Sequence, residues 1–458
     1  MKTNLDNVRR KNVLIVGFGK SGIAAAGVMS QLGAFVTVQD SKRESEIDKG
    51  LLSIYRRKGV QFCLDRTPED PGSFDIVILS PGVSPELPFV QEAKEKGAEI
   101  TGELELAYRI AKGDYVAITG TNGKTTTTTL TGEIFENSGR KTFVGGNIGV
   151  AVAAEAAQSE EGDWLVTECS SFQLETTKYF TPKISAILNL SPDHLNRHHT
   201  FENYANAKAK IFANQREDSW FVTNYNDETC RKLAKRCRAK IAWFSRTEEV
   251  PCGAFVKDGR ITMKDSEGNL TDICGTDEIQ IPGGHNVENV LAAAALAWFS
   301  GIDGKVIADT VRAFKGVEHR LEYCANIDGV RYYNDSKGTN TDASITAVRG
   351  IGENIILIAG GDAKGQNFDC LVKEFPGRVK KLLLMGRDAG MIRESCDKLG
   401  FRDYQLCKDM SECVRTAASI AAPGDNVVLS PACASWDMYD NFEQRGRHFK
   451  ELVKELER

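Results

Sequence analysis

The 458 residues of the chain suffice for about three compact domains of roughly 150 residues each, so a single small binding module is excluded. Hydrophobic residues make up 41% and charged residues 26%, which is the mixture of a globular protein and not of a disordered or fibrous one. Lys and Arg number 58 against 63 Asp and Glu, and this net charge of −5 offers no general attraction for nucleic acid or anionic lipid.

Export and membrane insertion are not expected. The longest strongly apolar helical run covers only 290–299, whereas a membrane span needs about 18 residues. Residues 1–12 are polar and of mixed charge, unlike a signal peptide. The twelve cysteines include no C-x-x-C pair, so we expect reduced, mostly buried thiols in a cytoplasmic protein. With only six histidines, a polyhistidine metal cage is not expected either.

Short β-branched runs, glycine turns and stretches of helical period alternate along the chain, which predicts an α/β fold with parallel sheets and crossover helices. The expected strands form three series: 12–17, 34–38 and 75–79; then 115–119, 164–168 and 184–190; then 354–358, 379–384 and 426–429. We therefore predict Rossmann-like domains at 1–102 and 317–458, and a P-loop-type ATP-binding domain at 103–316.

The first glycine motif, Gly17-Phe-Gly-Lys-Ser-Gly22, follows the first strand, and Asp40 ends the second. This arrangement is typical of a dinucleotide site in which the acid binds a ribose hydroxyl. The same glycines suit the diphosphate of a UDP-linked substrate, faced by Ser80-Pro-Gly82 from a neighbouring strand end, or they serve helix packing alone.

The second motif, Gly120-Thr-Asn-Gly-Lys-Thr125, lies between a strand and a helical run over 126–137. In this context it predicts a phosphate loop, in which Lys124 neutralises phosphate charge and the Thr125 hydroxyl reaches Mg²⁺. Ile118 stands where the full Walker pattern has its first glycine, so the loop is a shortened variant. The alternative is a chance turn.

Metal and catalytic candidates follow the next two strands. Glu168 ends one strand, where an acid commonly completes an Mg²⁺ site opposite a phosphate loop. His194 follows another, although a lone histidine is more often structural. His198 and His199 are expected in a solvated loop. Lys208, taken by itself, would be interpreted as a helix-surface lysine.

Nucleotide contacts are expected from two domains. Gly284-His-Asn-Val-Glu-Asn289 opens an alanine-rich helix, and its amides suit the edge of adenine or serve as helix caps. His319-Arg320 and Asn334-Asp-Ser-Lys337 follow the second predicted boundary.

Together these segments resemble the Mur ligases, ATP-dependent amide-forming enzymes of peptidoglycan synthesis. The resemblance covers essentially the whole chain and follows the family's order: Gly120 to Thr125, Gly145-Gly-Asn-Ile-Gly149, Glu168, Asp193-His194, His285-Asn286 with Asn289, His319-Arg320, and Asn334 to Lys337. Three segments are similar to the member that adds D-glutamate: Ser170-Ser-Phe-Gln-Leu-Glu-Thr176, Gly360-Gly-Asp-Ala-Lys364, and Ser430-Pro-Ala-Cys-Ala-Ser435 with Asn441-Phe-Glu-Gln-Arg-Gly446.

The resemblance implies a role for each matching residue. Lys124, His194 and Lys208 would be catalytic. ATP would be bound by Gly120, Thr121, Asn122, Gly123, Lys124, Thr125, Thr126, Asn286, Asn289, Arg320 and Asp335. Two Mg²⁺ ions would be held by Thr125, Glu168, His194 and Lys208, the last carbamylated by CO₂. The UDP-linked substrate would contact Lys20, Ser21, Asp40, Ser41, Lys42, Ser80, Gly82, Asn147 and Gln173, and D-glutamate would contact Thr339, Lys364, Ser435 and Phe442.

The activity implied is the ATP-dependent addition of D-glutamate to UDP-N-acetylmuramoyl-L-alanine through an acyl phosphate, by a monomer in the cytoplasm. Whether Lys42 or Arg43 stacks on uracil is left open. Three alternatives are also open: an NAD-dependent oxidoreductase, a non-enzymatic nucleotide-switch protein that turns over ATP without any dependence on an amino acid, and a sister Mur or folylpolyglutamate-type ligase with a different amino acid.

Overall fold

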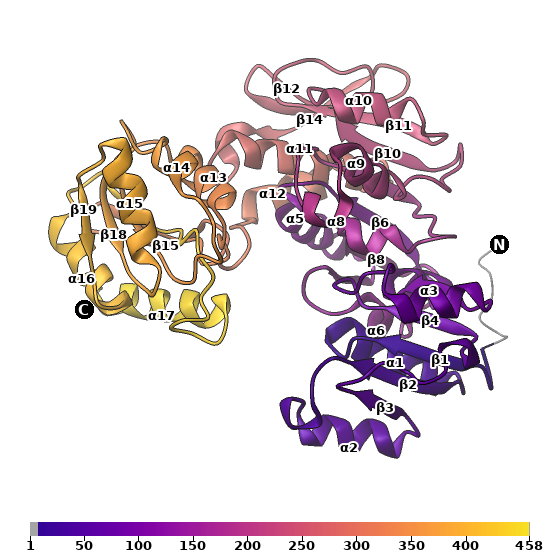
Figure 1. Cartoon of the computed structure of the whole chain (residues 1–458). Coiled ribbons are helices and arrows are strands. Elements are labelled where there is room, and N and C mark those ends of the chain that lie inside the picture. Colours follow the sequence, from indigo (N-terminus) through magenta and orange to yellow (C-terminus); the bar gives the residue numbers. More distant parts are fainter. Residues whose placement is uncertain (1–7, 458) are drawn as a thin grey trace. The chain divides into compact units, whose positions relative to one another are not determined.

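The computed structural model describes residues 8–457, apart from the side chain of Asn196 (Figure 1). The described chain contains three separate sheets in two compact units. The first unit runs to Glu278 and takes in Glu288–Val311; the second consists of Ile279–Val287 and the chain from Arg312 onward. The predicted α/β class is confirmed, while the predicted domain bounds stay a prediction.

The first sheet is entirely parallel, with strand order β3-β2-β1-β4-β5. Its strands are β1 Asn12–Val16, β2 Phe35–Asp40, β3 Gln61–Leu64, β4 Ile76–Leu79 and β5 Glu99–Gly102. The α-helices of this segment are α1 Lys20–Gln31, α2 Lys49–Arg57, α3 Pro88–Glu95 and α4 Glu103–Ile110. Two short 3₁₀ helices, labelled η, are η1 Glu44–Glu46 and η2 Pro71–Ser73. Successive β1 side chains enter two different cores, Val13 and Ile15 on one face and Leu14 and Val16 on the other. Both faces are therefore covered, as a parallel sheet requires.

The second sheet has nine strands, in the order β14-β13-β12-β11-β10-β9-β6-β8-β7. The strands are β6 Asp114–Thr119, β7 Thr142–Gly146, β8 Trp164–Glu168, β9 Ile184–Ile187, β10 Trp220–Asn224, β11 Lys240–Ser245, β12 Gly253–Lys257, β13 Arg260–Lys264 and β14 Leu270–Gly275. The helices are α5 Lys124–Asn137, α6 Val152–Ala156, α7 Ser171–Glu175, α8 Leu195–His198, α9 Phe201–Ala209, α10 Glu228–Ala234, η3 Thr276–Glu278, α11 Gly284–Trp298 and α12 Gly304–Ala313.

An antiparallel extension of this sheet departs from the predicted parallel pattern. Strands β12, β13 and β14 pair antiparallel, whereas the other pairs of the sheet are parallel. The signal was present in the sequence, because Asp258-Gly259 is a two-residue connection of the kind that favours tight hairpins. Both residues have positive φ, +48° and +73°, as such a turn requires.

The third sheet lies in the second unit, with strand order β15-β16-β20-β17-β18-β19 and one antiparallel pair, β15 with β16. Its strands are β15 Glu322–Ile327, β16 Val330–Asn334, β17 Ile355–Ala359, β18 Val379–Leu384, β19 Tyr404–Leu406 and β20 Asn426–Leu429. The helices are α13 Thr341–Ile351, α14 Asp369–Val372, α15 Ala389–Leu399, α16 Met410–Ile420 and α17 Phe442–Glu455. Two cores cover the two faces of this sheet, with Leu357 in one and Ile356 in the other.

Two expectations from composition are tested by the described residues. In that part of the chain, no helix combines the length and the apolar character that crossing a bilayer would demand. All twelve cysteines are free, and most are buried, as predicted; Cys370 is exposed.

Candidate active site

The phosphate loop connects β6 to α5, and its glycines are required by its shape. Gly123 adopts φ +81°, and a Cβ there would lie 2.1 Å from Oδ1 of Asn289. The Asn289 side chain therefore packs directly against the loop, and only glycine fits at position 123. The helix begins at Lys124, whose Nζ donates to the Thr121 carbonyl at 2.7 Å. The loop therefore presents a helix N-terminus and an ammonium group to the same region, which suits a polyphosphate.

Three of the predicted site residues form one hydrogen-bonded set. The Thr125 hydroxyl donates to Oε2 of Glu168 at 2.9 Å, and the Asn147 amide donates to Oε1 at 2.9 Å. Glu168 is buried at the end of β8. A hydroxyl and a carboxylate beside a phosphate loop are the oxygen donors that Mg²⁺ prefers, so this set fits that ion.

Lys208 is buried next to the phosphate loop, with 2% of its surface exposed. Its Nζ donates to the Gly120 carbonyl at 2.8 Å and to the Thr119 hydroxyl at 3.2 Å. Burial, reinforced by the charge of Lys124, lowers the pKa of Lys208 to about 7. The interpretation of Lys208 as a helix-surface lysine is wrong, because α9 packs this side chain against the end of β6.

The exposure of the three neighbouring histidines agrees only partly with the prediction. His194 is about half exposed, with φ +51°, and its Nε2 lies 3.4 Å from Oδ2 of Asp193. The expectation that His198 lies in a solvated loop is wrong. It ends α8 and is buried, with Nε2 3.0 Å from the Ser171 hydroxyl, and burial lowers its pKa. His199 is exposed, as expected.

Two residues that shape the phosphate loop were missed. Asn189 follows β9 and binds Asn122 twice, accepting from its backbone N–H at 2.8 Å and donating to its carbonyl at 3.1 Å. The hydroxyl of buried Tyr204 lies 3.1 Å from that of Thr121, and its ring lies under the Lys208 ammonium, 4.8 Å from the centroid. The available signals were a polar residue at a strand end and the four-residue spacing of Tyr204 and Lys208, which places both on one helix face.

The first glycine motif forms a tight strand-to-helix turn. A Cβ on Gly22 would lie 1.8 Å from the Gly17 carbonyl oxygen, so glycine is needed for this close approach. The Ser80 hydroxyl donates to the same carbonyl at 3.1 Å. Asp40 accepts from the backbone N–H of Phe18 at 2.6 Å and from that of Lys42 at 2.9 Å. The structure thus brings the predicted residues of this motif together, and Asp40 already organises the turn.

The remaining predicted contacts of the UDP-linked substrate lie in the same unit. Lys20 and Ser21 begin α1, Ser41 follows β2, and Gly82 lies in the turn after β4. Gln173 is buried in α7, where its side chain accepts from the backbone N–H of Ser170 at 2.9 Å.

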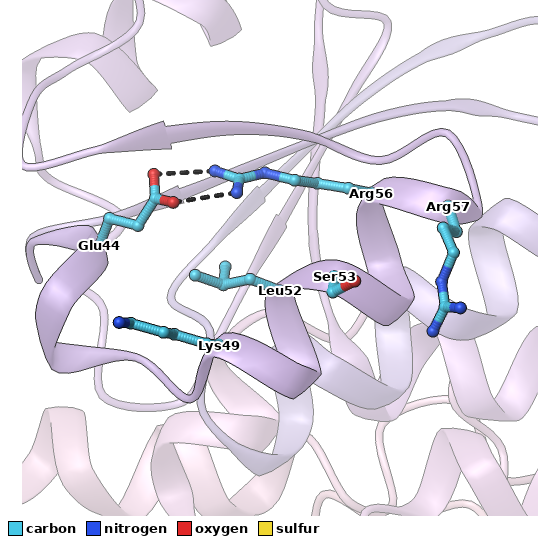
Figure 2. A pocket seen from close by; sticks show the side chains of 6 residues that line it. All are labelled: Glu44, Lys49, Leu52, Ser53, Arg56 and Arg57. Atoms are coloured by element: carbon cyan, nitrogen blue, oxygen red, sulfur yellow. Dashed lines mark hydrogen bonds and ion pairs between the residues drawn. The ribbon is translucent and has the colours of Figure 1, made fainter.

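Arg43, and not Lys42, lines a pocket of about 380 Å³ together with Phe62 and Leu64. An adjoining pocket of about 480 Å³ is lined by Lys49, Leu52, Ser53, Arg57 and the Glu44–Arg56 pair (Figure 2). Both carboxylate oxygens of Glu44 accept from Arg56, at 2.9 and 2.8 Å. The first of these pockets favours Arg43 over Lys42 as the planar group available to a base, and its contact with uracil stays a prediction.

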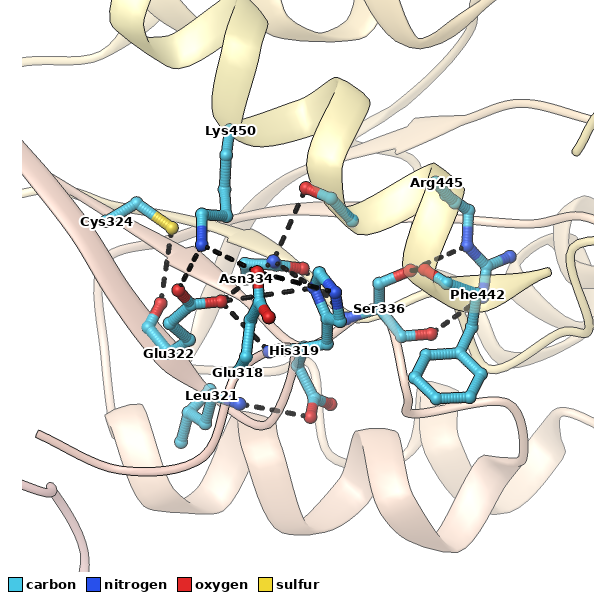
Figure 3. Close-up of polar contacts among 12 residues, drawn as sticks. Glu318, His319, Leu321, Glu322, Cys324, Asn334, Ser336, Phe442, Arg445 and Lys450 are labelled. Atoms are coloured by element: carbon cyan, nitrogen blue, oxygen red, sulfur yellow. Dashed lines mark hydrogen bonds and ion pairs between the residues drawn. The ribbon is translucent and has the colours of Figure 1, made fainter. Parts of the chain in front are cut away.

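The second unit contains a buried polar cluster around His319 (Figure 3). The Asn334 amide donates to Nδ1 of His319 at 2.9 Å, which assigns the ring proton to Nε2. Beside it, Asp335 accepts from the Leu321 N–H at 3.2 Å and from the Ser430 hydroxyl at 2.7 Å. Burial raises the pKa of Asp335 to about 6, against the opposing effects of these bonds and of the Arg320 charge. The Arg320 charge therefore acts on the Asp335 carboxyl, and the contacts of both residues with ATP stay a prediction.

The four residues predicted to bind D-glutamate follow adjacent strands of the third sheet. Thr339, Lys364 and Ser435 lie in the segments after β16, β17 and β20, and Phe442 begins α17. Ser435 is buried, whereas Lys364 is exposed. Because these strands are neighbours and parallel, their carboxyl ends bring the segments to one edge of the sheet.

The two predicted adenine-side amides fall in different units. Asn286 belongs to the second unit, where its amide donates to the Pro282 carbonyl at 2.7 Å. Asn289 belongs to the first unit, against the phosphate loop as described above.

Parallel sheets with a phosphate loop at a strand's carboxyl end define a nucleotide-binding α/β protein. Three family models identify it further: the Mur ligase MurD-like N-terminal domain over residues 11–102, the Mur ligase middle domain over 118–297, and the Mur ligase glutamate ligase domain over 319–433. The chain belongs to the Mur ligase family, which confirms the resemblance.

Curated relatives match over the full length. A protein of Alkaliphilus oremlandii named UDP-N-acetylmuramoylalanine–D-glutamate ligase is 49% identical, covering 99% of this chain and 100% of its own. A protein of the same name from Clostridioides difficile is 46% identical, covering 98% and 100%. Among solved structures, the UDP-N-acetylmuramate–alanine ligase of Thermotoga maritima has a TM-score of 0.60 at 20% identity, covering 97% of this chain and 100% of that chain, and shows the same fold.

Proposed function

We propose that this protein joins D-glutamate to UDP-N-acetylmuramoyl-L-alanine with the hydrolysis of ATP, as a step of peptidoglycan precursor synthesis. The observation that carries the proposal is the buried set around the phosphate loop: Lys208 on the Gly120 carbonyl and Thr125 on Glu168. The full-length identity of 46–49% to relatives named for this substrate pair supports the choice of substrates.

The chemistry has two steps. The L-alanyl carboxylate attacks the γ-phosphorus of ATP, so that an acyl phosphate forms and ADP leaves. The amine of D-glutamate then attacks the acyl carbon and loses a proton, and phosphate leaves as the amide forms. Lys124 and the amides of the phosphate loop stabilise negative charge during the first step. In this proposal Asn289 supports the loop, and Arg320 and Asp335 would contact phosphate and ribose, as the family resemblance implies.

Two Mg²⁺ ions are part of the proposal. Thr125 and Glu168 would hold one, and His194 with a carbamylated Lys208 the other. Bound Mg²⁺ would neutralise the charge of the phosphate oxygens. The described residues favour the carbamate, because CO₂ reacts only with a neutral amine and burial holds the pKa of Lys208 near 7. At neutral pH about half of such amines are neutral, against roughly four in ten thousand for an ordinary lysine.

The decisive experiment measures phosphate release from ATP with Mg²⁺ and UDP-N-acetylmuramoyl-L-alanine while the amino acid is varied. We expect release with D-glutamate and not with L-glutamate, L-alanine or L-lysine. Equal release with L-lysine or L-alanine would instead indicate a sister ligase. Hydride transfer to NAD without any ATP dependence would indicate an oxidoreductase.

The sister ligases are the second candidate, and sequence identity separates them. A solved UDP-N-acetylmuramate–alanine ligase and a solved D-alanyl-D-alanyl ligase share the fold at only 20% and 14% identity. We further propose that the enzyme acts as a monomer in the cytoplasm. The twelve free cysteines agree with a reducing compartment, and sedimentation of the purified protein tests the monomer.

A further inference from the structure

Trp436 stands next to the predicted D-glutamate residues and is not among them. With 65% of its surface exposed, it is the most exposed large hydrophobic side chain among the described residues. The Nζ atom of Lys364 lies 3.9 Å from the centroid of its ring. An ammonium group over an indole face is attracted by the ring's quadrupole, and Trp is the most favourable partner for this contact.

The loops that carry these two residues are fastened to each other. Asp362 and Ala434 form a two-way backbone bridge, in which Asp362 N–H donates to Ala434 O at 3.0 Å and Ala434 N–H donates back at 2.9 Å. Lys364 and Trp436 each lie two residues beyond this bridge. A Cβ on Gly361 would lie 2.3 Å from the Ala434 oxygen, so the approach of the loops requires glycine.

The acid in the Lys364 loop is already engaged elsewhere. Asp362 Oδ1 accepts from the backbone N–H of Lys364 at 3.1 Å and lies 3.0 Å from Nη2 of Arg387. Lys364 itself has φ +49°, an uncommon conformation for a residue with a side chain. The loop therefore holds the Lys364 ammonium over the indole, with its charge available to a carboxylate from outside the chain.

We propose that Trp436 is a positioning residue for the incoming amino acid. Its indole face holds the Lys364 ammonium in place for a carboxylate of D-glutamate, so that less side-chain freedom is lost when the substrate binds. This inference rests on the proposed function, in which Lys364 contacts D-glutamate, and adds a residue that acts through Lys364.

Steady-state kinetics of the full-length enzyme test the proposal. Trp436→Leu removes the aromatic face, and we expect the KM for D-glutamate to rise by about two- to fivefold, with kcat and the KM for ATP unchanged. Trp436→Phe keeps a face and should restore most of the wild-type KM. Phe35→Leu, which truncates an aromatic side chain that is 62% exposed on the first sheet, is the matched control and should change nothing.

The dependence on Lys364 separates positioning from general packing. Lys364→Met removes the ammonium, and in that background Trp436→Leu should cause no further rise in KM. An unchanged KM in Trp436→Leu, or an equal rise in both backgrounds, overturns the inference. If the wild-type enzyme shows no D-glutamate dependence at all, the proposed function has failed instead.

Tryptophan fluorescence gives a readout independent of turnover. D-glutamate added in the presence of UDP-N-acetylmuramoyl-L-alanine and a non-hydrolysable ATP analogue should change the emission, because a carboxylate at Lys364 alters the charge above the indole. The change should be absent from Trp436→Phe and from Lys364→Met. An identical change in Trp436→Phe would assign the signal to another of the five tryptophans and contradict the proposal.

Discussion

Lys208 is the residue whose chemistry depends most on its surroundings. Lys208→Ala removes both the buried amine and its proposed carbamate, so we expect activity to fall on the order of 100-fold or more, as for loss of a metal ligand or its support. Short carboxylic acids such as acetate, which supply the missing oxygens, should restore part of the activity. The measurement is phosphate release with and without added acetate.

Lys210→Ala is the matched control for this experiment. Lys210 lies two residues further along the chain, and its Nζ donates to the carbonyls of Glu175 and Thr177 at 2.6 and 3.2 Å. Its loss should cost some stability without any rescue by acetate. A fully active Lys208→Ala enzyme would contradict the carbamate.

Gly123 tests whether the phosphate loop needs its close contact with Asn289. Gly123→Ala would place a methyl group 2.1 Å from Oδ1 of Asn289, so we expect ATP-dependent phosphate release to fall to background. Gly139→Ala is the control, since Gly139 has nearly the same φ, +82° against +81°, and nothing within 4 Å of the added Cβ. It should cost only about 1 kcal/mol of stability and keep its activity. Activity in Gly123→Ala equal to that of Gly139→Ala would show that the loop does not need its close contact with Asn289.

At this scale the sequence predicted residue types better than their environments. Gly123, Lys124 and Thr125 were identified from local order alone, because the strand, the turn and the helix are neighbours in the chain. The burial of Lys208 and His198 arises from the packing of α8 and α9, which local periodicity does not specify. Only the family resemblance pointed to Lys208.

At the scale of elements, α4 and α6 meet through a buried carboxyl group. Glu103, the first residue of α4, is 2% exposed, and its Oε1 accepts from the Ala153 N–H of α6 at 2.5 Å. Burial, followed in the same direction by the nearby charge of Glu155, raises the pKa of Glu103 to about 7, against the lowering effect of the Ala153 bond. The folded state therefore binds a proton between about pH 4.5 and 7 that the unfolded state has released, so stability falls as pH rises through this range.

Glu103→Gln removes this titration while keeping the oxygen that accepts from Ala153. We expect the loss of stability between pH 5 and pH 8 to shrink by an amount on the order of 1–3 kcal/mol, measured by urea unfolding at both values. Any cost of burying the amide is common to both pH values and cancels in the difference. Glu95→Gln, at an exposed position of α3, should leave the pH dependence as in the wild type. The same dependence in Glu103→Gln would refute the role of this carboxyl.

The sequence also predicted elements unevenly. Parallel strands with buried β-branched runs were found in all three series, because both of their faces are covered and the apolar run is continuous. The strands β12 to β14 were missed, although Asp258-Gly259 marks their first turn. Strand pairing across the sheet depends on contacts between distant segments, and no local pattern specifies the order of nine strands.

For the whole molecule, the two compact units have separate cores: those of the first unit are drawn from residues 8–243 and those of the second from residues 321–456. Ile279–Val287 joins the second unit, so that α11 begins in one unit and ends in the other, while the predicted boundary at 316 stays a prediction. A helical pattern is continuous in sequence and carries no sign of such a division.

Separate cores lead us to expect more than one unfolding transition. Phe375 is fully buried in the second unit, with its ring 5.1 Å from that of Phe401. Phe375→Ala should destabilise the second unit by about 3–5 kcal/mol and leave the transition of the first unit in place. Phe221→Ala, equally buried beside Phe212 in the first unit, should do the reverse. Calorimetry combined with hydrogen exchange assigns each transition to its residues, and one transition that moves as a whole in both variants would contradict independent units.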